Sequence, residues 1–374
     1  MLHFPRPLRL AAGIAVVATA ALSLTACAGD SDAANSESAS ATSVADFGTF
    51  ADLEAAAKEE GALNVIALPR DWANYGAVLD LFAERYPEIT INEGSPDVSS
   101  AEEIQAAKTN AGTDKAPDVF DLGLAVALEN VDSFAPYKVE GFDDIPDSLK
   151  DPDGRFVGDY GGYMSVGVDT SKFPAPSELS DLAGAEYKGA VAINGDPTQA
   201  GAAFAAVGLA SVLGGGSLDD FQPGIDFFGE LNSAGNFLKV DVTPATVASG
   251  ETPVVFDWDY LNAAYTADNP DWQVIVFPDQ GYASYYNPAI NADAPHPAAA
   301  RLWQEFLFSD EVQNLFLAGG ARPARMDAMT EAGTIDAELA AALPEVPAET
   351  LVPSEEQSDA AGTLLGEKWA AAVQ

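Results

Sequence analysis

Two carboxylates flank a tryptophan in residues 254–261, which read V-V-F-D-W-D-Y-L. Apolar residues bracket the group, and burying an unpaired carboxylate is costly, so Asp257 and Asp259 need solvent or a positive partner. An ammonium beside one of these carboxylates gains charge-assisted hydrogen bonds, and over the face of Trp258 it gains a cation–π contact of about 0.5–2 kcal/mol. The stretch therefore predicts a binding site for a cation, with Tyr260 beside it. The alternative is a solvated strand edge with the Trp258 ring in the core.

A second group of candidate ligand-binding residues lies in residues 70–75, which read R-D-W-A-N-Y. Trp72 and Tyr75 could stack on the same cation, or they could pack at the start of a helix. Arg70 in the same stretch would favour an anionic ligand instead. Asp121 joins the predicted site because ligands bind beyond the strand ends of α/β proteins.

One helix start predicts a different class of ligand. Asp196 and Thr198 precede an apolar helix and could simply cap it. Alternatively, the N-terminus of that helix faces the ligand and binds an oxyanion such as a phosphonate.

Catalytic and cofactor motifs are scarce. The run Gly214–Gly216 lacks the lysine and Ser/Thr of a phosphate-binding loop, and it fits a helix stop better. His296 is the only histidine after the first few residues, so a Ser-His-Asp triad would depend on it. A histidine-rich or thiolate zinc site is excluded by count. We therefore expect no enzyme activity, no cofactor and no metal; a secreted carboxylate-based hydrolase is the alternative from another functional class.

The first residues predict export. Arg6 and Arg9 precede a long apolar run, as in a secretory signal peptide. The run ends in L-T-A-C, which resembles the lipobox of bacterial lipoproteins, and Cys27 is the only cysteine of the chain. We expect a signal peptide over residues 1–26, a lipid on Cys27, and a flexible tether of small polar residues over 27–47. The protein would then be extracytoplasmic and anchored to the cell membrane by that lipid.

Composition limits the partners. The chain has 374 residues with 58 acidic and 17 basic side chains, which gives a formal net charge of −41. Such a surface repels nucleic acid and attracts cations. The content of 48% hydrophobic and 9% aromatic residues is that of a globular protein, and the length allows two or more cores.

Strand and helix patterns alternate along the chain, which predicts βαβ units and a mainly parallel sheet. The strand candidates are residues 63–68, 89–91, 118–122, 191–193, 253–256 and 274–277. The helix candidates are residues 47–61, 75–86, 100–111, 199–213, 221–231, 297–308, 309–318 and one helix after 353. Ser100 and Glu103 have the spacing of a capping box at the start of their helix.

Several segments, taken in order, resemble bacterial extracellular solute-binding proteins, the receptors of ABC importers. They are E-G-A-L-N-V at 60–65, L-F-A-E-R-Y-P at 81–87, A-P-D-V at 116–119, Y-K-G-A-V at 187–191, A-P-H-P-A-A-A at 294–300 and F-L-F-S at 306–309. The resemblance covers about residues 61–325.

The resemblance implies an α/β fold of the two-lobe periplasmic-binding-protein-like type (type II), with two crossover strands and a ligand cleft between the lobes. Lobe one is expected over residues 48–166 and 283–345, lobe two over 170–280, and a helical tail over 346–374. Gly167 lies near the first expected crossover, where it could serve as a hinge for lobe closure.

The resemblance also bears on the ligand. The spacing of Trp72 and Tyr75 is similar to the aromatic pair of spermidine/putrescine-binding proteins. In those proteins a lobe-two tryptophan and an acid also line the site, with one residue between them, whereas Trp258 and Asp259 are adjacent here. We expect a monomeric, lipid-anchored receptor that delivers a small solute, a polyamine-like amine, to an ABC permease in the membrane.

Two other ligand classes stay open within the same fold. The hypothesis of an oxyanion or phosphonate ligand rests on the N-terminus of the helix after Thr198. The ferric-iron reading rests on Tyr285 and Tyr286, which are similar to the paired tyrosines of iron-binding relatives. That pair is expected in lobe two, however, where Tyr260 occurs instead.

Overall fold

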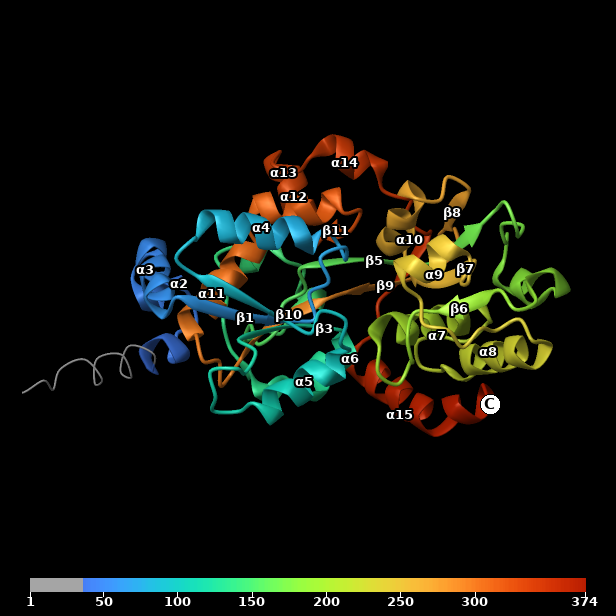
Figure 1. Cartoon of the computed structure of the whole chain (residues 1–374), viewed down its shortest axis with the longest axis horizontal. Helices are drawn as coiled ribbons and strands as arrows, with labels where there is room; N and C mark the ends of the chain where they lie inside the picture. The colour runs from blue at the N-terminus through green and yellow to red at the C-terminus, as the bar shows by residue number, and fades with distance from the viewer. Residues whose placement is uncertain (1–35) are drawn as a thin grey trace, which may run out of the picture.

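The computed structural model describes residues 36–374, so the predicted signal peptide and Cys27 lie outside the described residues. Helices and strands form two lobes, one toward each end of the long axis of the molecule, and long strands run between them (Figure 1). This arrangement confirms the predicted α/β, two-lobe fold. The expected mainly parallel sheet is wrong, because the strand that runs between the lobes and the strand at the centre of the lobe-one sheet pair antiparallel with their neighbours.

Lobe one contains two small sheets covered by helices. The strands of these sheets are β1 (Ala62–Ile66), β2 (Thr90–Gly94), β3 (Val119–Leu122), β4 (Phe134–Ala135) and β10 (Asn287–Asn291). A further short strand, β11 (Arg322–Pro323), belongs to the larger sheet described below. The helices of lobe one are α2 (Val44–Phe47), α3 (Phe50–Glu60), α4 (Tyr75–Arg85), α5 (Ser100–Thr109), α6 (Leu124–Glu129), α11 (Pro297–Leu307), α12 (Asp310–Ala318), α13 (Met326–Ala332) and α14 (Ala337–Ala342). Strands β1 and β2 pair in parallel, whereas β10 lies between β3 and β4 and is antiparallel to both.

Lobe two is built around one end of a seven-stranded sheet. It contributes the strands β6 (Val191–Ile193), β7 (Val254–Trp258) and β8 (Trp272–Ile275). Its helices are α7 (Gly201–Leu213), α8 (Gln222–Ala234), α9 (Pro244–Ser249) and α10 (Asp259–Ala264). Helix α7 is almost uniformly apolar and is buried along most of its length, so it forms the centre of this lobe.

Two strands, β5 (Tyr160–Asp169) and β9 (Gln280–Tyr285), connect the lobes. The first half of β5 pairs with β9 and β11, with Gly161 opposite Tyr285. The second half pairs with β7 and β8, with Val166 opposite Phe256. One strand therefore belongs to both lobes, which fixes the lobe-two sheet relative to the lobe-one elements.

Gly167 lies within the lobe-two sheet, and its expected hinge role is not what the structure indicates. It pairs with Val255 on one side and with Val274 on the other. A Cβ atom at Gly167 would lie 2.2 Å from Asn262 Oδ1 and 2.4 Å from a ring carbon of Trp272. The glycine is required by close packing in a core.

The tether differs from the sequence expectation over its last residues. Ser38, Ala41 and Val44 are buried, although residues 27–47 were expected to be flexible. The reason is Arg301, a buried cation whose guanidinium donates hydrogen bonds to the carbonyl oxygens of Ala39 and Ala41 at 2.7 and 2.8 Å. In the structure, the segment from Ser38 onward packs on lobe one.

The C-terminal segment crosses the molecule. Strand β12 (Glu349–Leu351) pairs in parallel with the connecting strand β9. Helix α15 (Glu355–Ala372) then packs against α6 of lobe one and α8 of lobe two, and Figure 1 shows it running from near α6 beneath lobe two. Trp369 of α15 contacts Phe228 and Phe237 edge-on. Within residues 36–374, none of the helices has the length and apolar character needed to cross a bilayer.

Candidate functional site

A cleft of about 770 Å³ lies between the lobes. Lobe one lines it with the segments that follow β1 and β2, the start of α5, Asp121 within β3 and Tyr286 before β10. Lobe two lines it with the segment after β6, the first turn of α7 and residues of α9 and α10. Ligand sites at the carboxyl ends of strands and between domains are the rule in α/β proteins. We take this cleft as the candidate solute site.

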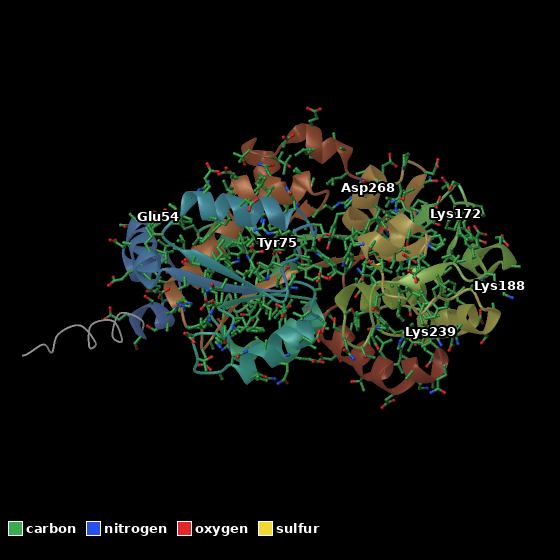
Figure 2. The ribbon with its side chains drawn as sticks, in the orientation of Figure 1. Glu54, Tyr75, Lys172, Lys188, Lys239 and Asp268 are labelled. Atoms are coloured by element: carbon green, nitrogen blue, oxygen red, sulfur yellow. The ribbon has the colours of Figure 1, made fainter. Side chains whose placement is uncertain are left out.

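The charged side chains that line the cleft are all acidic. Acidic side chains occur on both walls: Asp71, Asp97, Glu102, Glu103, Asp121, Asp196, Asp241 and Asp268. Among the described residues, no lysine, arginine or histidine lines it. Figure 2 shows Lys172 and Lys188 on the side of lobe two that is far from lobe one.

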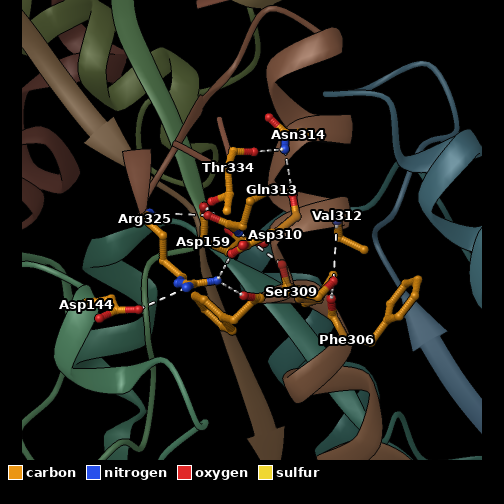
Figure 3. Close-up of polar contacts among 12 residues, drawn as sticks. Asp144, Asp159, Phe306, Ser309, Asp310, Val312, Gln313, Asn314, Arg325 and Thr334 are labelled. Atoms are coloured by element: carbon orange, nitrogen blue, oxygen red, sulfur yellow. Dashed lines mark hydrogen bonds and ion pairs between the residues drawn. The ribbon is translucent and has the colours of Figure 1, made fainter. Parts of the chain in front are cut away.

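Two arginines of lobe one form ion pairs with acidic side chains outside the cleft. Arg70, which could have favoured an anion, donates to Asp80 and Glu93 at 2.9 and 2.8 Å on the exterior. Figure 3 shows Arg325 directed toward Asp310 and Asp144, with nitrogen–oxygen distances of 2.7 and 2.9 Å. Neither guanidinium is available to neutralise the cleft acids.

The deepest acids are Glu103 of α5 and Asp121 of β3, which are 1% and 5% exposed. The backbone N–H of Asp121 donates to Glu103 Oε2 at 3.0 Å, and the hydroxyl of Tyr160 donates to Asp121 Oδ2 at 3.0 Å. Their other oxygens, Glu103 Oε1 and Asp121 Oδ1, have no hydrogen-bond partner in residues 36–374. Buried polar atoms are normally partnered, so these two oxygens mark a place where a ligand donor fits.

Burial dominates the electrostatics of this pair. It raises the pKa of Glu103 well above its usual value, against the opposing effect of the hydrogen bond from Asp121. It also raises the pKa of Asp121 to about 7, although the Tyr160 and Tyr75 hydroxyls lower it. The cause in both cases is that an apolar interior disfavours the charged carboxylate.

Sequence reasoning missed Glu103 because the cap of α5 lies one residue earlier than expected. Ser99 is the N-cap, and its backbone N–H and hydroxyl both donate to Glu102 Oε2 at 2.9 Å. The hydroxyl of Ser100 instead accepts from the backbone N–H of Gly123 at 3.0 Å. The signal in the sequence was the pair of consecutive glutamates, Glu102 and Glu103, at the start of the helix. Glu102 caps the helix, and Glu103 accepts a hydrogen bond from β3.

Aromatic rings form part of the cleft wall. Trp72 and Tyr286 line it, with ring centroids 5.7 Å apart in an edge-on arrangement. Tyr260 lies behind Trp72 at 6.4 Å between centroids. The Tyr260 hydroxyl and the Trp258 indole N–H are buried without a partner within the described part of the chain.

The two acids of the opening stretch are buried in β7 and at the start of α10. Asp257 is 0% exposed, and its Oδ2 accepts from the side chain of Asn194 at 3.0 Å. Asp259, also 0% exposed, forms an ion pair with Arg322. Asn194 lines the cleft, whereas Asp257 and Asp259 do not.

The solvated strand edge that was weighed for these acids is therefore wrong, because both have partners inside the protein. Burial raises the pKa of Asp257 to about 7. Burial also raises the pKa of Asp259, while Arg322 lowers it.

The other predicted site residues divide into two groups. Trp72, Asp121 and Asp196 line the cleft. Tyr75 points into the interior of lobe one, where its hydroxyl lies 3.5 Å from Asp159 Oδ2 (Figure 2). Thr198 does not line the cleft; its N–H and hydroxyl both donate to Asp196 Oδ1, at 2.8 and 2.7 Å, so that Asp196 caps the turn before α7.

Residues 36–374 contain no group of three or more His, Cys, Asp or Glu side chains placed to hold a metal ion.

Comparison with known proteins gives a consistent result. Residues 116–342 match the family model described as bacterial extracellular solute-binding protein. No curated protein matches the chain by sequence. Among solved structures, an ABC transporter substrate-binding protein from Bradyrhizobium japonicum has a TM-score of 0.65 at 19% identity, over 84% of this chain and 100% of the other.

Two further structures have the same fold. A putative spermidine/putrescine ABC transporter protein from Listeria monocytogenes has a TM-score of 0.64 at 14% identity, over 82% of this chain and 98% of the other. A periplasmic thiamin-binding protein has a TM-score of 0.65 at 17% identity, over 84% of this chain and 96% of the other.

Proposed function

The chain belongs to the bacterial extracellular solute-binding proteins, the receptors of ABC transporters, and on that premise we propose that its solute is a small organic cation of the polyamine-like amine class. The solute is bound between the lobes and passed to a permease in the membrane.

The observation that supports a cationic solute is the composition of the cleft wall. Eight acidic side chains and no basic one line it within the described residues. A cleft lined by one sign of charge concentrates solutes of the opposite sign. The rings of Trp72 and Tyr286 add faces on which an ammonium gains a cation–π contact of about 0.5–2 kcal/mol.

We propose distinct roles for the predicted residues. Trp72, Asp121 and Asp196 contact the solute directly. Asp257 acts through Asn194, which it orients at the cleft wall. Asp259 holds Arg322 and contributes to the fold of the lobe interface rather than to solute contact.

An oxyanion such as a phosphonate is the second candidate solute. Gly201 and Ala202, at the start of α7, line the cleft, and the N-cap Ala200 provides no side-chain cap for the free amide groups there. The neighbouring Asp196 opposes an anion at this position. Ferric iron is the third candidate, because Tyr286 lines the cleft; its neighbour Tyr285 does not.

A binding panel tests the proposal. Thermal unfolding of the protein would be followed with putrescine, spermidine, a phosphonate, a sugar and ferric citrate. A ligand at about 100 times its Kd adds about 2.7 kcal/mol to the free energy of unfolding. We expect the amines to raise the melting temperature; a shift with the phosphonate or ferric citrate alone would replace the amine by that class.

A second measurement separates a receptor from a carboxylate-based hydrolase. The protein is incubated with the stabilising amine and then denatured, and the released solute is identified by mass spectrometry. A receptor returns the solute unchanged, whereas a converted product would establish an enzyme.

We also propose that the receptor is a monomer anchored to the cell membrane through a lipid on Cys27. Cys27→Ala should move the folded protein from the membrane fraction to the soluble fraction, with unchanged amine binding. A variant that still sediments with membranes would contradict the lipid anchor and leave the solute assignment intact.

A further inference from the structure

We propose that Glu103 and Asp121 form the subsite for one ammonium group of the solute, and that this ammonium displaces a proton which the pair holds in the ligand-free protein. The inference rests on the proposed function, since it assumes an amine solute.

The two side chains form a built site. They come from different elements, α5 and β3, and the backbone N–H of Asp121 joins them by a 3.0 Å hydrogen bond to Glu103 Oε2. Both side chains are more than nine-tenths buried, and both line the cleft. Each keeps one buried oxygen without a hydrogen-bond partner among the described residues, so the pair has two unused acceptors.

The surroundings provide no positive charge. The titratable groups that interact with the pair come from α4, β5, the segment before it, α10 and the segment before β10. They are Tyr75, Asp159, Tyr160, Tyr260 and Tyr286. All of these are acids or phenols, and none can neutralise a carboxylate.

Two ionised carboxylates in such an interior are costly, and the charge of Asp121 acts on Glu103. At least one of them therefore carries a proton when no cation is bound. The elevated pKa values of both groups, which burial causes, agree with this assignment.

An ammonium supplies the missing charge. It donates hydrogen bonds to Glu103 Oε1 and Asp121 Oδ1, while the rings of Trp72 and Tyr286 lie on the same cleft wall. The carboxyl O–H bond then breaks, its electron pair stays on the oxygen, and the proton passes to the buffer. Because one proton leaves for each amine bound, affinity should rise about tenfold per pH unit where the ligand-free pair holds its proton and the amine-bound pair does not.

The test is isothermal titration of the full-length protein with putrescine at neutral pH, in two buffers that differ in ionisation enthalpy. The difference in heat gives the number of protons released on binding. We expect about one proton for the wild type.

Three variants make the assignment specific. Glu103→Gln and Asp121→Asn should each abolish proton release and weaken putrescine binding by about ten- to a hundredfold. Glu305→Gln is the matched control, because burial also raises the pKa of Glu305 to about 7, but its carboxylate accepts from Tyr137 and Glu140 away from the cleft. This control should release the same proton as the wild type.

The outcomes separate the two proposals. Putrescine binding with equal heat in both buffers overturns the proton displacement and leaves the amine receptor standing. Proton release that persists in both Glu103→Gln and Asp121→Asn also overturns it. No binding of any amine, together with binding of another solute class, removes the proposed function and this inference with it. If the variants fail to fold, as judged by circular dichroism, the two-buffer measurement on the wild type decides alone.

Discussion

The carboxylate of Asp259 and the guanidinium of Arg322 form a buried ion pair, and both residues are less than 10% exposed. Asp259→Asn leaves the Arg322 charge without its partner, which costs about 3–5 kcal/mol in comparable buried pairs. We expect a large loss in the free energy of unfolding and amine affinity within about twofold of the wild type. Chemical denaturation and titration calorimetry check the two parts separately.

The control removes both charges. Asp259→Asn combined with Arg322→Met should recover much of the lost stability, since replacing a whole buried pair by apolar groups is often neutral. A single variant with normal stability and weakened amine binding would show that Asp259 contacts the solute after all, as the sequence first suggested.

Trp72 is the cleft residue whose ring should matter most to a cation. Trp72→Ala removes one cation–π face and should weaken amine binding by about 2- to 30-fold. Trp72→Phe keeps a smaller ring and should lose less. Titration calorimetry measures both variants; unchanged affinity with a lowered melting temperature would mean that Trp72 only packs against Tyr286.

At the residue scale, cleft residues at or after strand ends could be predicted from the sequence. Side chains whose partners are distant in the sequence could not. Trp72 lies in the segment after β1 and Asp121 lies near the end of β3, and both line the cleft. The surroundings of Asp259 depend on Arg322, which is 63 residues away in the sequence. No local pattern contains that partner.

At the scale of elements, β5 depends on glycine where it passes through the lobe-two core. A Cβ atom at Gly167 would meet Asn262 and Trp272 within 2.4 Å, so Gly167→Ala should lower the free energy of unfolding by about 1–3 kcal/mol or more. Chemical denaturation measures the loss.

Gly366 in α15 provides the matched control for that substitution. An added Cβ atom there has nothing within 4 Å, and the residue lies inside a helix. Gly366→Ala should therefore stabilise the protein by about 0.4–1 kcal/mol. Equal effects of the two substitutions would mean that the space around Gly167 can relax.

The elements that were predicted well are those with a local signature. Helices α11 and α12 begin at a proline and at a serine cap, and both were expected within one or two residues of their bounds. The residue ranges of β5, β9 and β10 were not among the strand candidates, although the resemblance implied two crossover strands. They contain glycine, proline and polar residues, and their pairing partners are distant in the sequence.

At the scale of the whole molecule, buried carboxyls set the pH dependence of stability. Burial raises the pKa of Asp257, Glu305 and Asp121 to about 7, whereas the unfolded chain titrates these groups near pH 4. Between these values the native state binds more protons than the unfolded state, so the free energy of unfolding falls as pH rises. The net charge of −41 acts in the same direction through self-repulsion.

We therefore expect the ligand-free protein to resist urea better at about pH 5 than at about pH 8. Glu305→Gln should reduce this slope, because it removes one of the responsible carboxyls. Stability that rises over the same interval would contradict the protonated state of these groups.

The pairing of β3 with β10 also sets the order in which the molecule can form during synthesis. Leu122 and its partner Asn287 are 165 residues apart, and the lobe-two segments lie between them in the chain. A polypeptide made from its N-terminus exposes the apolar edge of β3 throughout that interval, which is a period of aggregation risk. Lobe two can assemble its own strands before β10 arrives, and lobe one cannot be completed until afterwards. The cleft between them is consequently among the last parts of the molecule to exist.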